Sequence, residues 1–278
     1  AMKLRTAIGL LVLSATSLNA QVVSRHEALR YATRMADAVI ARNAIVHREW
    51  DYTAGVVLLG IEAAGQRTNN RAYADYVRKN MDRLVRADGT IESYELEEFN
   101  LDQVAQGRLL FLLYQQTKDE RYRKAIELLR EQLRRQPRTK EGGFWHKKIY
   151  PWQMWLDGLY MGQPFYAEYS QVFGEDNWND IANQFVWMEK HARDPKTGLL
   201  YHGWDESKEQ RWANKETGLS PHVWGRAMGW YAIALADTLD YFPKNHPRRA
   251  ELVAIFNREA EAITKYQDRE GLWWDIID

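Results

Sequence analysis

The feature that most constrains the fold is a helical periodicity of apolar residues that recurs along almost the whole chain. Apolar residues follow one another at three- and four-residue steps, which places them on one face of an α-helix. Strand-like alternation is scarce, and glycine or proline marks most of the gaps between helical segments. The pattern predicts helices over residues 26–43, 54–64, 71–86, 101–117, 119–135, 155–173, 176–191, 225–241 and 247–267.

A weak internal repeat accompanies the helices. Four segments open with an aromatic or polar residue beside a charged one, and each is soon followed by a glycine. Most of them recur after about 50–55 residues, a period that fits one helical hairpin per repeat. The segments are Trp50-Asp51-Tyr52, Asn100-Leu101-Asp102, Trp155-Leu156-Asp157 and Trp224-Gly225-Arg226, with the glycines Gly55, Gly107, Gly158 and Gly229.

The two helices of each hairpin differ in polarity. The first, as in 54–64, is apolar almost all round, whereas the second, as in 119–135, carries many charges. A helix that is apolar on every side is expected to be buried, and a charged one to be half exposed. Alternation of the two kinds predicts an all-α fold with an inner and an outer ring of helices, an α/α toroid.

On that architecture, the residues that open the inner helices share one mouth. Carboxylates, imidazoles, a guanidinium and tryptophans would converge there, which is typical of a carbohydrate site, and the arginine indicates an anionic sugar. The 12 tryptophans and 15 tyrosines agree, since their rings suit partly wet surfaces. The candidate site residues are Tyr52, Asp102, His146, Trp155, Asp157, His202, Trp224, Arg226 and Trp230.

Charge and cysteine content exclude other classes of function. The 38 basic and 38 acidic residues cancel, which argues against a nucleic-acid partner. The chain has no cysteine, so thiolate catalysis and cysteine-ligated metal sites are excluded.

The N-terminus resembles a secretory signal peptide. Lys3 and Arg5 precede a short apolar run over 7–13, and small residues lead to Ala20. We therefore expect cleavage of residues 1–20, export to the periplasm, no membrane association after cleavage, and a catalytic domain over 21–278. The alternative is that this segment is the first helix of the fold.

Three segments together resemble the signature of unsaturated rhamnogalacturonyl hydrolases, glycoside hydrolase family 105, which are related to the unsaturated glucuronyl hydrolases of family 88. Their order and spacing agree with the family, and the likeness extends over most of the chain after residue 45. The segments are Trp145-His146 with Tyr150–Met161, then Gly198–Glu206, then Trp224–Trp230.

The resemblance implies an (α/α)6 six-hairpin barrel, no metal and no cofactor. It also implies an unusual reaction, in which water adds across the C4=C5 double bond of a 4,5-unsaturated galacturonyl residue. That residue lies at the non-reducing end of a rhamnogalacturonan oligosaccharide. The hydrated sugar is an unstable hemiketal that opens and releases the remaining chain.

By the same resemblance, Asp157 is the catalytic residue. One carboxyl group gives a proton to C4 and then accepts one from the water that attacks C5. Asp102 would hold the substrate, while His202 and Arg226 would contact the uronate or its hydroxyls. The remaining candidates, His146, Trp155, Trp224, Trp230 and Tyr52, would line the same subsite.

The chain is short for this fold. At about 50 residues per hairpin, six hairpins need about 300 residues. We therefore expect a barrel whose last hairpins are missing at the C-terminus, with uncovered inner-helix faces, and a monomer or weak dimer.

Other interpretations remain open. An unsaturated glucuronyl hydrolase acting on glycosaminoglycan fragments would use the same pair of aspartates. An ordinary hydrolase or epimerase on the same toroid would need acid and base groups at other positions. A non-catalytic protein that binds oligosaccharides is the alternative from another functional class.

Overall fold

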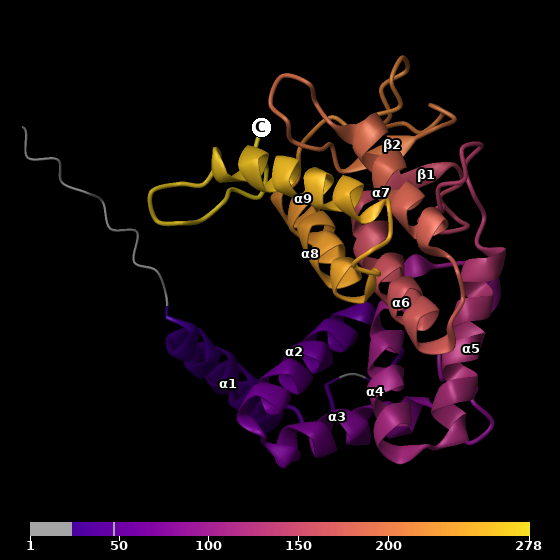
Figure 1. Cartoon of the computed structure of the whole chain (residues 1–278), viewed down its shortest axis with the longest axis vertical. Helices are drawn as coiled ribbons and strands as arrows, with labels where there is room; N and C mark the ends of the chain where they lie inside the picture. Colours follow the sequence, from indigo (N-terminus) through magenta and orange to yellow (C-terminus); the bar gives the residue numbers. More distant parts are fainter. Residues whose placement is uncertain (1–23, 47) are drawn as a thin grey trace, which may run out of the picture.

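The computed structural model describes residues 24–46 and 48–278, and the predicted signal segment 1–20 lies outside them. Helices dominate the described residues, as predicted (Figure 1). The α-helices are α1 (Arg25–Arg42), α2 (Tyr52–Thr68), α3 (Arg71–Leu84), α4 (Arg108–Thr117), α5 (Glu120–Arg135), α6 (Leu156–Phe173), α7 (Trp178–Ala192), α8 (Gly225–Tyr241) and α9 (Arg249–Thr264). The 3-10 helices are η1 (Leu96–Glu98), η2 (Leu101–Gln103) and η3 (Ala105–Gly107).

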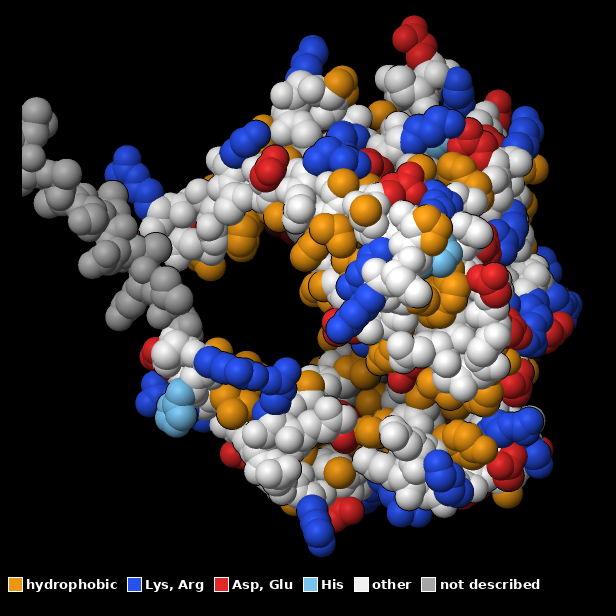
Figure 2. All heavy atoms as spheres, viewed as in Figure 1, with side chains coloured by type: hydrophobic (Ala, Val, Ile, Leu, Met, Phe, Trp, Pro, Cys, Tyr) orange, Lys and Arg blue, Asp and Glu red, His pale blue; other side chains and the backbone are white. Residues whose placement is uncertain are grey.

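Even-numbered helices form the inner ring and odd-numbered helices the outer one. Residues of α2, α4, α6 and α8 together line a cavity of about 840 Å³ between them. Figure 2 shows a hollow on this side of the ring bordered by hydrophobic side chains, and an outer surface on which acidic and basic side chains alternate. The α/α toroid predicted from the sequence is therefore confirmed.

Burial explains which helix faces inward. In α6, thirteen side chains are buried, and they include residues on every side of the helix. In α5, the buried residues recur at three- and four-residue steps, while Arg134 and Glu131 on the remaining surface are exposed or half-exposed. Each hairpin thus removes one apolar helix from water and covers it with an amphipathic one.

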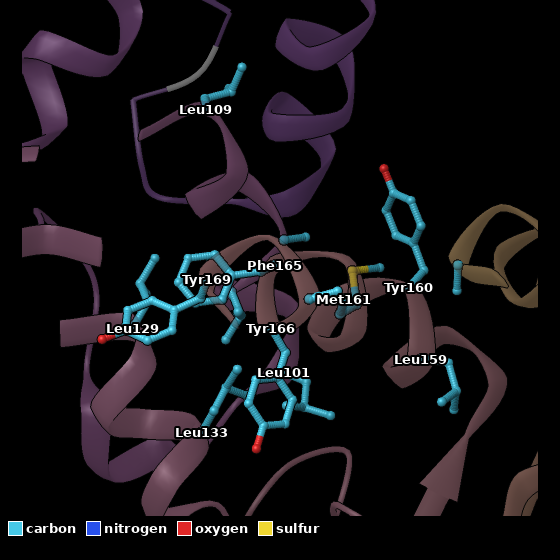
Figure 3. Close-up of a cluster of buried hydrophobic side chains, with 14 of the residues drawn as sticks. Leu101, Leu109, Leu129, Leu133, Leu159, Tyr160, Met161, Phe165, Tyr166 and Tyr169 are labelled. Atoms are coloured by element: carbon cyan, nitrogen blue, oxygen red, sulfur yellow. The ribbon is translucent and has the colours of Figure 1, made fainter. Parts of the chain in front are cut away.

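The hydrophobic core extends through all the described α-helices, and one part of it lies between α4, α5 and α6. Figure 3 shows Leu101, Leu129 and Leu133 packed around the aromatic residues of α6. Phe111 of α4 lies against Phe165 of α6 with ring centroids 5.2 Å apart. Aromatic rings therefore fill the space where inner and outer helices meet.

The loops above the inner helices contain a strand pair that the periodicity did not predict, and the start of the predicted helix 101–117 is formed by η2 and η3. Strands β1 (Gln153–Trp155) and β2 (Gly203–Asp205) pair antiparallel, with Met154 opposite Trp204. Three residues per strand are too few for alternation to be visible in a sequence. The pair joins the segment before α6 to the segment between α7 and α8.

Ser24, Asp51, Asn70 and Asp119 cap the N-termini of α1, α2, α3 and α5 with their side chains. Asp51 accepts a hydrogen bond of 2.9 Å from the backbone N–H of Thr53 at the start of α2. Asp51 is therefore the N-cap of α2, as expected for an aspartate directly before a helix. Among the residues that the structure describes, no helix is both long and apolar enough to cross a bilayer.

The burial of Glu168 in the inner helix α6 can be tested through the pH dependence of stability. Burial raises the pKa of Glu168 to about 7, and Arg108 and a hydrogen bond with Tyr241 oppose this only partly. Because the unfolded chain ionises Glu168 near its ordinary 4.5, the protonated form favours folding, and this stabilisation is lost as pH rises through about 7. We expect Glu168→Gln to raise the melting temperature by roughly 3–6 °C at pH 8 but little at pH 5.

Differential scanning calorimetry at both pH values measures this effect. Glu261→Gln, at an exposed position of α9, is the matched control and should show no pH-dependent gain. Equal melting temperatures for Glu168→Gln and wild type at pH 8 would contradict the burial of an ionisable group in the ring.

Candidate active site

All the predicted site residues lie at the N-terminal ends of inner helices or in the loops beside them. Tyr52 opens α2, Asp102 lies in η2 before α4, and Asp157 lies in the first turn of α6. Trp224 and Arg226 flank the first residue of α8, and Trp230 follows Arg226 by one helical turn on the same face.

Three backbone hydrogen bonds join the loops that carry the site. The N–H of Leu101 donates to the carbonyl of His146 at 3.1 Å, and the N–H of His146 donates to that of Gln153 at 2.8 Å. The N–H of Leu156 donates to the carbonyl of His202 at 3.0 Å. Asp102, His146, Asp157 and His202 are thereby brought together from segments that are far apart in the sequence.

Asp102 is held by two basic side chains. Its Oδ1 lies 3.2 Å from Nε2 of His146, and its Oδ2 lies 2.6 Å from Nζ of Lys147. Burial by itself would raise the pKa of Asp102, but the contacts with His146 and Lys147 outweigh it and lower this pKa to about 2. Asp102 is therefore a carboxylate at any pH near neutrality.

Asp157 lies in a different environment. Its side chain is 14% exposed, and its Oδ2 lies 3.0 Å from Nε2 of His202. Neither of these two buried atoms completes a hydrogen bond with the described residues. The N-cap residue of α6 is Trp155, and no side chain caps this helix, so helix capping does not explain Asp157. Buried polar atoms without protein partners are characteristic of sites that receive a ligand.

His146 lies between the two aspartates. It is 2% exposed, and its Nδ1 lies so close to Gly158 that a Cβ there would be 2.9 Å from it. Gly158 is thus a position where close approach requires glycine. Close packing also requires glycine at Gly107, where a Cβ would meet the side chain of Leu129. At Gly229 no atom lies close enough to exclude a side chain.

Trp155 supports His146. The two rings stack with centroids 4.4 Å apart, and Tyr150 stacks on the same indole at 5.0 Å. Trp155 Nε1 donates to Oε1 of Gln153 at 3.0 Å. With two rings parallel to it, the indole offers little free face, and its edge is directed toward Gly203.

A second aromatic group lies at the start of α8. His202 meets Trp224 edge to face at 5.0 Å, and the guanidinium of Arg226 lies 4.1 Å above the Trp224 ring. Trp224 Nε1 donates to Oδ1 of Asp275 at 2.7 Å. The exposed Arg226 thus presents a positive charge at the mouth.

Tyr52 and Trp230 form a separate pair within the ring. Their centroids lie 6.4 Å apart, and Trp230 also lies 4.5 Å from Tyr160, which lines the central cavity. Through Tyr160, this pair lies next to the central cavity.

Sequence reasoning missed three of the supporting residues. Lys147 and Tyr150 lie within or beside the recognised segment, but nothing in the pattern shows that one pairs with Asp102 and the other stacks on Trp155. Asp275 is fifty-one residues from Trp224, and backbone pairing of the C-terminal segment with residues 223–225 brings it there.

Asp205, the last residue of β2, is fully buried and accepts hydrogen bonds from Ser207 and Gln210. Asp205 is buried because its carboxylate satisfies backbone donors of the following turn.

Comparison with known proteins gives the family of the chain. The model of Glycosyl Hydrolase Family 88 matches residues 26–278. The chain belongs to this family. It is 29% identical over 253 residues to the unsaturated rhamnogalacturonyl hydrolase YesR of Bacillus subtilis, a match that covers 88% of this chain and 70% of the relative.

Solved structures of family relatives share the fold. A family 105 glycoside hydrolase from C. acetobutylicum has a TM-score of 0.87 and 49% identity, with 89% of this chain and 69% of that chain covered. The unsaturated glucuronyl hydrolase of Bacillus sp. GL1 has a TM-score of 0.64 at 16% identity, with 88% and 70% covered. This family 88 chain is therefore a glycoside hydrolase of the α/α-toroid type.

Lys147 provides a test of the site's electrostatics. We expect Lys147→Met to raise the pKa of Asp102 by about one unit, because a cation at 2.6 Å is removed while His146 remains. Carbon-13 NMR titration of the aspartate carboxyl groups, assigned with Asp102→Asn, measures this pKa directly.

Lys148→Met is the matched control. Lys148 donates to the carbonyl of Glu97 and has no contact with Asp102, so its removal should leave the titration unchanged. An unchanged Asp102 titration in Lys147→Met would show that the ion pair does not hold this carboxylate.

Proposed function

We propose that this family 88 glycoside hydrolase removes the 4,5-unsaturated galacturonyl residue from the non-reducing end of rhamnogalacturonan oligosaccharides. The observation that carries the proposal is the contrast between two aspartates, Asp102 held as a carboxylate by His146 and Lys147, and Asp157 with His202 as its charged-group neighbour. The likeness to YesR, whose name states this activity, supports the substrate class.

Asp157 is the proposed acid and base. In its protonated form it donates to C4 of the unsaturated sugar, and the electron pair of the C4=C5 bond forms the new C–H bond. The resulting carboxylate then takes a proton from the water that attacks C5. Asp157 Oδ2 and His202 Nε2 lie 3.0 Å apart without completing a hydrogen bond, so both would bond to the incoming water or to sugar hydroxyls.

Charged groups around Asp157 would position the uronate. Arg226, fixed above the Trp224 ring, provides a planar guanidinium suited to a carboxylate. Asp102 cannot exchange protons near neutral pH, so it would accept hydrogen bonds from sugar hydroxyls. The hemiketal that forms at C5 then opens, and the glycosidic oxygen leaves with the remaining oligosaccharide.

Asp157→Asn tests the assignment. Asparagine keeps the shape of the side chain but cannot supply the proton, so we expect the rate to fall about 10³-fold. The measurement is the loss of absorbance of the conjugated uronate on lyase-digested rhamnogalacturonan, compared with wild type.

Asp176→Asn, at an exposed position before α7, is the control and should keep the wild-type rate. A wild-type rate for Asp157→Asn would remove Asp157 from its role. If the enzyme turned over unsaturated glycosaminoglycan disaccharides faster than pectic ones, its substrate class would be glycosaminoglycan fragments and not rhamnogalacturonan.

A further inference from the structure

The segment between β2 and α8, residues 206–222, lies beside the proposed site. Its base is fixed to β2, because Ser220 N–H donates to the carbonyl of Gly203 at 2.9 Å and Trp204 forms an isolated bridge with Leu219. In Figure 1 this segment extends beyond β2, at the end of the molecule where β1 and β2 lie. The same strand follows His202, which contacts Asp157.

Internal hydrogen bonds hold this segment in one conformation. The buried carboxylate of Asp205 accepts from the backbone of Ser207 and Gln210 at 3.0 and 2.9 Å. Lys215 Nζ donates to three backbone carbonyls, those of Lys208, Glu209 and Gln210. Side chains on this segment are therefore presented in fixed positions, as a binding site requires.

Trp212 lies on this segment next to Gly203, the residue after His202. Its ring reaches to within 3.4 Å of the position that a Cβ of Gly203 would occupy, and Trp155 lies 3.2 Å from the same point. Trp212 is half-buried but is not part of the hydrophobic core. Within the described chain its indole has no ring contact and no hydrogen bond, whereas Trp155, Trp204 and Trp224 are all stacked or paired. An indole with a free face beside a sugar site suits stacking on a pyranose.

Arg211 precedes Trp212 and is exposed. The two lysines of the segment donate to backbone carbonyls, Lys208 to that of Glu216 and Lys215 as described above. Arg211 forms no ion pair or hydrogen bond with any residue that the structure describes. A guanidinium without a partner, carried by the residue before Trp212 on a hydrogen-bonded segment, is suited to an anionic sugar.

We propose that residues 206–222 form a subsite for the leaving oligosaccharide. Trp212 stacks on the sugar that follows the unsaturated residue, and Arg211 binds the carboxylate of the next acidic sugar. This inference rests on the proposed function, and it extends that function to chain length. A substrate with a second uronate is bound by Arg211, and a disaccharide is not.

The experiment compares kcat/KM on two unsaturated substrates, the galacturonyl–rhamnose disaccharide and the tetrasaccharide that contains a second galacturonate. For wild type we expect the tetrasaccharide to be preferred. Arg211→Ala is expected to lower kcat/KM about tenfold on the tetrasaccharide and to leave the disaccharide unchanged. Trp212→Ala is expected to raise KM on both substrates.

Arg67→Ala is the matched control, since Arg67 is an exposed arginine in the last turn of α2, at the other end of the ring. Its ratio of the two kcat/KM values should equal that of wild type. Added salt should reduce the tetrasaccharide preference of wild type and of Arg67→Ala but not of Arg211→Ala.

The outcomes separate the two proposals. Wild-type turnover of the disaccharide, with the same substrate ratio in Arg211→Ala, would overturn the subsite and leave the proposed function intact. Absence of turnover of either substrate by wild type would overturn the proposed function and the subsite with it.

Discussion

The site depends on three backbone hydrogen bonds that tie separate loops together above the inner helices. Leu101 and Gln153 both bond to the backbone of His146, and Leu156 bonds to His202. Leu101 precedes Asp102 and Leu156 precedes Asp157, so backbone pairing fixes where these aspartates lie relative to His146 and His202. The glycine at 158 completes this arrangement, because any side chain there would displace His146.

The two aspartates differ because their partners differ. Lys147 and His146 keep Asp102 as a carboxylate, whereas no lysine or arginine in the described residues lies within ion-pair distance of Asp157. A carboxyl group that works as both acid and base has to change its charge during the reaction, and a nearby fixed cation would oppose protonation. In the proposed mechanism, Asp102 binds the substrate and Asp157 transfers the protons.

The fold could be predicted from the sequence because each helix pair carries its own signal. The apolar surface of residues 54–64 and the charged face of 119–135 indicated inner and outer helices without any knowledge of distant contacts. The site residues were found because they open the inner helices and lie in a recognisable family pattern. Lys147, Asp275 and Trp212 were not found, since their roles arise from pairings across loops: a salt bridge, a bond to an indole nitrogen and a contact over Gly203. Such contacts have no periodicity and therefore leave no local trace in the sequence.

The central claim is that water adds to the double bond before the glycosidic bond breaks. Proton NMR during turnover of the unsaturated disaccharide tests it most directly, by following the vinyl hydrogen at C4 and the reducing-end signals of the released rhamnose. The account predicts that the vinyl signal disappears no later than free rhamnose appears. Release of rhamnose while the vinyl signal remains on the freed uronate would show direct cleavage at C1 by two carboxyl groups, and would contradict the mechanism.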